Sequence, residues 1–177
     1  MSNAVCLPFT HWGTPMITAA KLAGFFAAHA IWCVSEGESL TPMLAYTTAK
    51  NERQLVRLVA EDFAASVALG KQKLQSNDMD ANDAALLFDG YITLEKEKVD
   101  AVIIEIRAYF SPSSEAVIAI PYTPRASGKF IVHRPKLVAW KDCEDFDIGA
   151  ALQSFFDGVH EHEKGSEIWK ESLDESK

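Results

Sequence analysis

The stretch from Ala84 to Trp140 constrains the fold most, because its pattern predicts four consecutive β-strands joined by short polar turns. The strands are expected at Leu86–Glu95, Val99–Phe110, Ala116–Tyr122 and Phe130–Trp140. Within the first strand, Asp89 and Gly90 favour a glycine bulge over a tight turn, because a turn there would leave a very short arm. Short links between neighbouring strands require antiparallel pairing, so the stretch predicts a β-meander.

Both faces of this predicted sheet are apolar. With the loops taken at their apparent lengths, one face carries Phe88, Ile92, Val99, Ile103, Glu105, Arg107, Tyr109, Ile118, Ile120, Tyr122 and His133. The opposite face carries Tyr91, Val102, Ile104, Ile106, Ala108, Val117, Ala119, Pro121, Phe130 and Val132. A one-residue slip would move a strand's side chains to the other face, yet both faces would remain apolar. Two apolar faces need two partners: helices, a second copy of the chain, or a ligand.

A helix is predicted from Pro15 to Glu36, preceded by the capping residue Thr14 and ended by Gly37. Its apolar residues circle nearly the whole cylinder, and small residues recur at every fourth position, at Ala20, Gly24 and Ala28. Another element can therefore approach its backbone closely, which indicates a central helix. The run Met16–Val34 is also a candidate membrane span. Because Lys21 lies inside it, we interpret it as a helix buried in a soluble core.

Further helices are expected at Asn51–Leu74 and Phe146–His160, with a short last helix from Ser166 to Leu173. The segment Leu40–Thr48, interrupted by Pro42, is expected to be a short edge strand or an extended connection. The predicted fold class is α+β, an antiparallel β-meander of four to five strands packed with three main helices. A chain of 177 residues of ordinary globular composition suits a single domain spanning 1–177, with frayed final residues.

The net charge of −8 is concentrated at the C-terminus. Met1–Lys141 holds 14 acidic and 14 basic residues, whereas Asp142–Lys177 holds 11 acidic and 3 basic. This acidic C-terminus makes nucleic acid and a membrane surface unexpected partners. A run of cations without acidic residues precedes it, at Arg125, Lys129, Arg134, Lys136 and Lys141. The run is expected to pair with the acidic tail of its own chain or a neighbour's, the alternative being an anionic-ligand site.

Three cysteines, Cys6, Cys33 and Cys143, are odd in number and widely spaced. This usage fits thiols in a reducing compartment, and no basic segment precedes an apolar run at the N-terminus. We therefore expect a cytoplasmic protein.

The candidate site for chemistry is a polar cluster on the otherwise apolar sheet, consisting of Glu105, Arg107, Tyr109 and His133. The first three alternate along one strand, and His133 is expected two strands away, near Arg107. A carboxylate and an imidazole in an apolar setting could act as acid and base, with Arg107 holding an anionic substrate. The alternative, which we favour, is a structural ion pair between Glu105 and Arg107.

Other histidines carry weaker signals. His160 and His162 lie two residues apart at a helix end and point in different directions, so a solvated helix terminus is favoured over a metal site. His29 and Cys33 share a helix face, where a core histidine beside a buried thiol is favoured over a metal or an activated nucleophile. His11 precedes the first helix without a second residue to pair with it. No cofactor and no metal site are expected.

The prolines and aromatic residues between Tyr109 and Arg125 make two stiff loop ends, which suit recognition or serve only as turns. Because few polar groups converge, we expect a non-enzymatic, protein-binding module that forms a homodimer. The alternative is a small-molecule-binding protein or an enzyme that uses the polar cluster.

Overall fold

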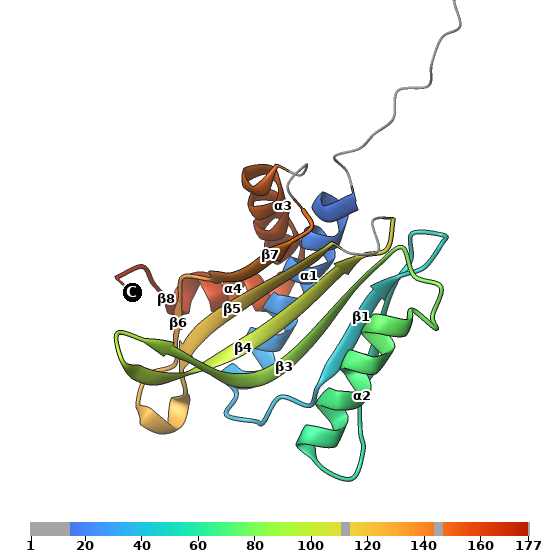
Figure 1. Cartoon of the computed structure of the whole chain (residues 1–177). Coiled ribbons are helices and arrows are strands. Elements are labelled where there is room, and N and C mark those ends of the chain that lie inside the picture. Colours follow the sequence, from blue (N-terminus) through green and yellow to red (C-terminus); the bar gives the residue numbers. More distant parts are fainter. Residues whose placement is uncertain (1–14, 111–113, 144–146, 177) are drawn as a thin grey trace, which may run out of the picture.

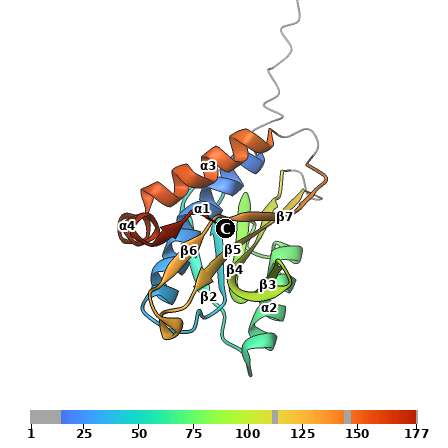
Figure 2. The same ribbon diagram turned by 90° about the vertical axis from the view of Figure 1, so that its left-hand side faces the viewer.

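The computed structural model describes residues 15–110, 114–143 and 147–176. It consists of a curled eight-stranded sheet with helices on both faces (Figures 1 and 2). Helices α1 (Pro15–Ser35), α3 (Ile148–Glu161) and α4 (Glu163–Ser172) lie on one side of the sheet, and α2 (Phe63–Ser76) lies on the other. The α+β class is therefore confirmed.

The sheet is larger than predicted and is mixed rather than purely antiparallel. Its strands are β1 (Met43–Thr47), β2 (Arg53–Arg57), β3 (Asp83–Leu94), β4 (Glu97–Ala108), β5 (Glu115–Thr123), β6 (Ile131–His133), β7 (Lys136–Lys141) and β8 (Leu173–Asp174). They follow the order β2-β1-β3-β4-β5-β6-β8, and β7 pairs with another part of β5. The four-to-five-stranded meander is wrong because β1 and β2 extend one edge and β8 joins β6 in parallel.

The predicted helix Asn51–Leu74 is wrong in its first half. Strand β2 occupies Arg53–Arg57, and α2 begins at Phe63 after the N-cap Asp62, whose side chain accepts a hydrogen bond from the Ala65 amide. A helix would place Leu55 and Leu58 on one face. In the structure they pack into the two cores on opposite sides of the sheet, as an extended chain allows.

Three other strand predictions need correction. The predicted strand Phe130–Trp140 is divided into β6 and β7, because Pro135 lies between them and cannot donate to a sheet ladder. Strand β3 is one long strand, but its pairing with β4 is continuous from Asp83 to Leu94, so the predicted bulge at Gly90 is absent. The predicted strand within Leu40–Thr48 exists as β1, which lies inside the sheet between β2 and β3 rather than at its edge.

Helix α1 is the central helix that its small residues predicted. Gly37 follows it with a φ of 87°, and the Gly37 amide donates to the carbonyl of Val34. The backbones of α1 and α3 meet at Gly24 and Gly158, where a Cβ atom would collide with backbone atoms of the other helix. Among the described helices, α1 is long and apolar enough to span a membrane, and 61% of its most apolar window is buried.

The register of β5 differs from the expectation by one residue. Ala101 pairs with Pro121 and Ile103 with Ala119, so Val117, Ala119 and Pro121 share a face with Glu105. Ile118, Ile120 and Tyr122 instead face α1 with Val102 and Ile104. A one-residue difference in register exchanges the two faces of a strand, because side chains alternate with a period of two.

The sheet separates two hydrophobic cores of unequal size. The larger lies between the sheet and α1, and the smaller lies between the sheet and α2. The buried members of the smaller core are Leu44, Leu58, Leu74, Ala84 and Leu86. Helix α2 crosses only the end of the second face formed by β1 and the start of β3 (Figure 1), so no helix within the described residues covers the rest of that face.

Candidate functional site

Glu105, Arg107 and Tyr109 lie together on the second sheet face, because they alternate along β4 beside α2. The Oε1 atom of Glu105 lies 2.8 Å from the Nζ atom of Lys71 on α2. Arg107 instead pairs with Glu115 on β5, at 3.3 Å. The expected Glu105–Arg107 ion pair is therefore replaced by two pairs, each of which joins β4 to a different neighbour.

Tyr109 ties the end of β4 to the end of α2. Its hydroxyl donates a 2.6 Å hydrogen bond to the carbonyl oxygen of Leu74. Burial raises the pKa of Tyr109 to about 12. At neutral pH the phenol is fully protonated and its proton is engaged, so this contact is structural.

The structure places His133 away from the other three candidates. The register sets His133 beside Pro121, and Pro121 pairs with Ala101, six residues from Arg107 along β4. At about 3.3 Å per residue, the separation along the strand is about 20 Å. His133 is buried, and its Nε2 atom lies 3.3 Å from the Oγ1 atom of Thr123. The expected proximity of His133 to Arg107 is wrong because β6 pairs with the end of β5, at Tyr122 and Thr123, whereas Arg107 pairs with Glu115 at its start.

A shallow depression of about 280 Å³ lies where β4, β5 and α2 meet. Its lining includes Lys71, Glu105, Arg107, Glu115 and Lys141. Four of these charges form the two ion pairs described above, and Lys141 adds a further cation at the rim. Such a surface attracts small anions weakly, because most of its charge is already compensated.

The uncovered part of the second face is apolar. We call it the open strip: Phe88, Ile92, Val99, Ile103 and Val117, all partly exposed. The small residues between them, Ala101, Ala119 and Pro121, are buried at the base of the strip. The Nζ atom of Lys71 lies 5.6 Å from the centre of the Phe88 ring, which marks the boundary with α2. The strip is an apolar surface fixed on paired strands.

The structure also brings together polar residues that sequence patterns do not connect. His29 on α1 lies 3.2 Å from His162, measured between Nδ1 and Nε2, although 133 positions separate them. The Tyr122 hydroxyl donates to Oδ1 of Asp89 at 2.9 Å, and burial raises the pKa of both groups. Asp83 is buried next to Thr18 of α1, and desolvation raises its pKa to about 6. Only the sheet register and the helix packing create these neighbours.

The weaker metal candidates have other contacts. Glu161 pairs with Lys21 and Arg53, and the ring of His162 caps α4 by accepting from the Gly165 amide. Burial raises the pKa of the Cys33 thiol, which favours its unreactive form. Within 15–110, 114–143 and 147–176, no group of three or more His, Cys, Asp or Glu residues could hold a metal ion. His11 and Pro112 lie outside the described residues.

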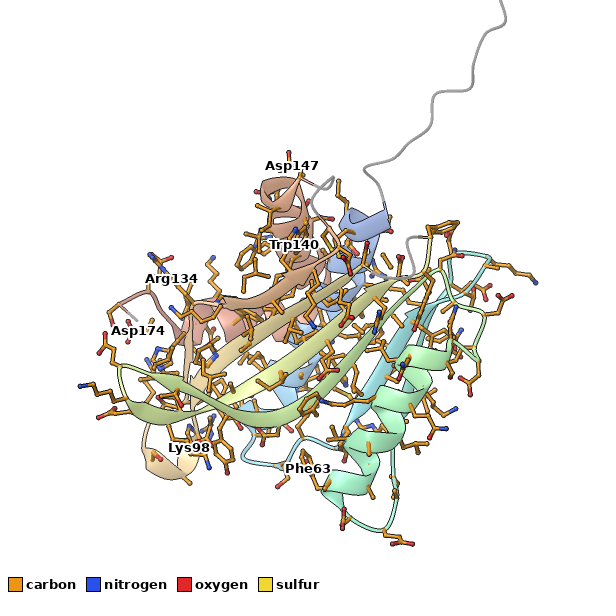
Figure 3. The ribbon with its side chains drawn as sticks, in the orientation of Figure 1. Phe63, Lys98, Arg134, Trp140, Asp147 and Asp174 are labelled. Atoms are coloured by element: carbon orange, nitrogen blue, oxygen red, sulfur yellow. The ribbon has the colours of Figure 1, made fainter. Side chains whose placement is uncertain are left out.

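Part of the basic run contacts the acidic tail, as expected. Arg134 forms an ion pair with Glu175 at 3.1 Å, and β8 of the tail pairs with β6. Figure 3 shows Arg134 and Asp174 at the same edge of the molecule. Arg125 instead donates from Nε to the carbonyl of Ser35, at the end of α1.

Comparison of the chain with models of protein families, with curated proteins and with solved structures found no match.

Proposed function

We propose that this protein is a non-enzymatic, cytoplasmic protein-binding module that forms a homodimer through the open strip. The observation that carries the proposal is the strip itself, an apolar surface on paired strands that α2 leaves partly exposed. Exposed apolar patches of this kind mark interaction sites in soluble proteins.

Self-association supplies the apolar cover that the second face lacks. A two-fold dimer places the same strip of both copies in contact, so one apolar surface serves as both partners. An ordinary interface of this type buries about 800 Å² per subunit. The cytoplasmic assignment is supported by the odd number and wide spacing of the three cysteines, which fit thiols in a reducing compartment.

The polar cluster supports the proposal because its members do not converge on a common point. Glu105 and Arg107 are each paired with a neighbouring opposite charge, and Tyr109 holds α2. Acid–base catalysis needs groups that converge on a common point within hydrogen-bond reach of a substrate. His133, the one imidazole in the candidate set, lies elsewhere on the sheet.

The second candidate function is the binding of a small anion in the depression beside Arg107 and Lys141. The observation that favours it is the extra cation at the rim. Inorganic phosphate and small dicarboxylates are suitable probes for calorimetry. Binding that Arg107→Ala abolishes, in a protein that stays monomeric, would favour this function over the dimer.

The proposal is tested by light scattering and sedimentation at micromolar concentrations. The wild-type chain should be a dimer, and Ile103→Lys should be a monomer, because a charge in the centre of the strip is costly to bury. The matched control is Val59→Lys, at a residue with 79% exposure before α2 and off the strip, which should remain dimeric. A monomeric wild type, or a dimer that Ile103→Lys leaves intact, would contradict the proposed interface.

A further inference from the structure

Strand β7 is an edge strand whose outer side is not paired with any strand in the described parts of the chain. Its sequence, Lys136 to Lys141, sets four apolar residues between two lysines. Leu137 is 38% exposed and Val138 is 58% exposed. An edge strand with exposed apolar side chains offers a partner both backbone hydrogen-bonding groups and apolar contacts.

The opposite edge of the sheet has a different character. Strand β2 has charged residues at both ends, and Arg53 is engaged by Glu161 and by the ring of Phe25. Long polar side chains and ion pairs protect an edge from further pairing. Strand β7 also ends in lysines and has a bulge at Val138, but no ion pair engages either lysine in the described parts of the chain, so of the two β7 is the edge better suited to accept another strand.

The molecule already shows which kind of strand this side accepts. Strand β6 continues into β7 with only Arg134 and Pro135 between them, and its outer side is covered by β8. Strand β8 comes from the acidic tail, and the next residue, Glu175, pairs with Arg134. An extended acidic segment is therefore accommodated beside the basic run at β6, while the same edge at β7 has no such cover in the described residues.

Charge selects between two occupants of the β7 edge. If a second copy paired its own β7 antiparallel and in centred register, each Lys136 would lie opposite a Lys141. Like charges directly opposite on neighbouring strands destabilise the pairing. A segment with acidic residues at both ends places opposite charges at those two positions.

We propose that β7 binds an extended segment of another protein by strand addition, and that this segment has acidic residues flanking a short apolar run. Backbone hydrogen bonds to the edge hold the segment, Leu137 and Val138 contact its apolar residues, and Lys136 and Lys141 select its charge. This surface is distinct from the open strip and goes beyond the proposed dimer.

The bulge at Val138 sets Lys136 and Lys141 opposite Ala119 and Glu115 of β5, four strand positions apart and on one face. The probe is therefore a fluorescent synthetic peptide, Ser-Glu-Val-Thr-Val-Glu-Ser, whose glutamates have this four-residue spacing. Anisotropy should show saturable binding to the wild-type chain. A peptide with lysine in place of both glutamates should bind at least about tenfold more weakly, since two cross-strand charge pairs change sign.

The protein variant reverses the charges instead. Lys136→Glu with Lys141→Glu should lose at least about tenfold in affinity for the acidic peptide and should bind the lysine peptide better than the wild type does. This reciprocal exchange shows that the variant is folded and that the two positions select charge. Lys136→Gln with Lys141→Gln provides a milder second variant, with an intermediate affinity expected.

The outcomes separate this proposal from the dimer. Ile103→Lys should keep peptide binding, and the β7 charge reversal should keep the oligomeric state. Equal binding of both peptides, or peptide affinity that follows Ile103→Lys instead of the β7 lysines, would overturn strand addition at β7. If the β7 charge reversal altered self-association, the occupant would be a second copy and the proposal would be wrong.

Discussion

His162 donates a hydrogen bond from Nε2 to Nδ1 of His29 and thereby joins the start of α4 to the central helix. The direction of this hydrogen bond follows from the contact that the other ring nitrogen of His162 makes. The Gly165 amide donates to Nδ1 of His162 at 3.0 Å, so in the neutral ring the proton resides on Nε2. His29 must then carry its proton on Nε2, which is buried without a hydrogen-bond partner in the described structure. Both rings are therefore neutral in this arrangement.

Acid should weaken this contact. Burial lowers the pKa of His29 and of His162 below the ordinary value of 6.5, and the positive charge of Arg57 also lowers that of His29. The unfolded chain therefore binds protons first as the pH falls through 6.5. The free energy of unfolding should decrease as the pH falls below this value, and it should be fully restored above it.

Urea unfolding between pH 5 and 7 measures this slope. His162→Asn should reduce it, since the amide can still cap α4 but does not titrate. The comparison variant is His160→Asn, at an exposed residue in the last turn of α3, whose slope should follow the wild type. An unchanged slope in His162→Asn would assign the acid sensitivity to other groups.

Asp83 should destabilise the folded chain at neutral pH. The residue is 3% exposed, and desolvation raises the pKa of its carboxyl from 3.8 to about 6, so ionisation in the folded state costs about 2 to 3 kcal/mol. Asp83→Asn keeps the oxygen that accepts from Thr18 and removes the charge. We expect the variant to be more stable than the wild type at pH 7 by about 2 kcal/mol.

The sign of this effect is opposite to that of the histidines. The folded state retains the Asp83 proton between pH 3.8 and about 6, so the wild type gains stability from this group as the pH falls through that window. Below pH 3.8 the advantage of Asp83→Asn should disappear. If Asp83→Asn were instead less stable than the wild type by the same amount at pH 7 and below pH 3.8, Asp83 would make a favourable structural contact.

Gly24 should not tolerate a side chain. A Cβ atom there would overlap the carbonyl oxygen of Phe155, a backbone atom of α3 that cannot rotate away. Gly24→Ala should cost about 3 kcal/mol or more in unfolding free energy, because the helices must separate. Gly149→Ala, in the exposed first turn of α3, is the milder comparison: its Cβ would lie 3.2 Å from Oδ1 of the N-cap Asp147, a side chain that can shift, so the change should cost less than about 1 kcal/mol. A tolerated Gly24→Ala would contradict the close approach of α1 and α3.

Substitutions in the turn between β3 and β4 should increase the stability of the folded chain. Glu95 and Lys96 both have positive φ, at 48° and 77°, in the two-residue connection that favours Asn-Gly. Glu95→Asn with Lys96→Gly should stabilise the chain by about 1 kcal/mol, since it relieves the left-handed conformations. The same pair of changes two residues later, at Glu97 and Lys98 in β4, should destabilise the chain, because Asn and Gly disfavour strands. Denaturation midpoints of the two double variants decide this directly.

Local patterns determined the elements that depend on neighbouring residues. The apolar residues around nearly the whole of α1 and its small residues predicted a central helix, and Gly37 ends it as expected. The alternation in Val99–Phe110 identified β4, and its two apolar faces follow from a period of two. The turn at Glu95 was marked by polar residues between two apolar runs.

Tertiary structure decided the strand register, the sheet face that each side chain occupies and the contacts between distant segments. Leu55 and Leu58 suit a helix stripe as well as an extended chain that reaches both faces of a sheet, and only their two separate cores distinguish these cases. The register of β5 differs from the predicted one by a single residue, and strand propensity does not distinguish the two registers. Glu105, Arg107 and Tyr109 were correctly placed together on one face, and the register gives His133 the same face, but His133 lies beside Pro121 at the far end of β5 and not near Arg107. His29 and His162 became neighbours only because α4 packs on α1, a contact that no local pattern encodes.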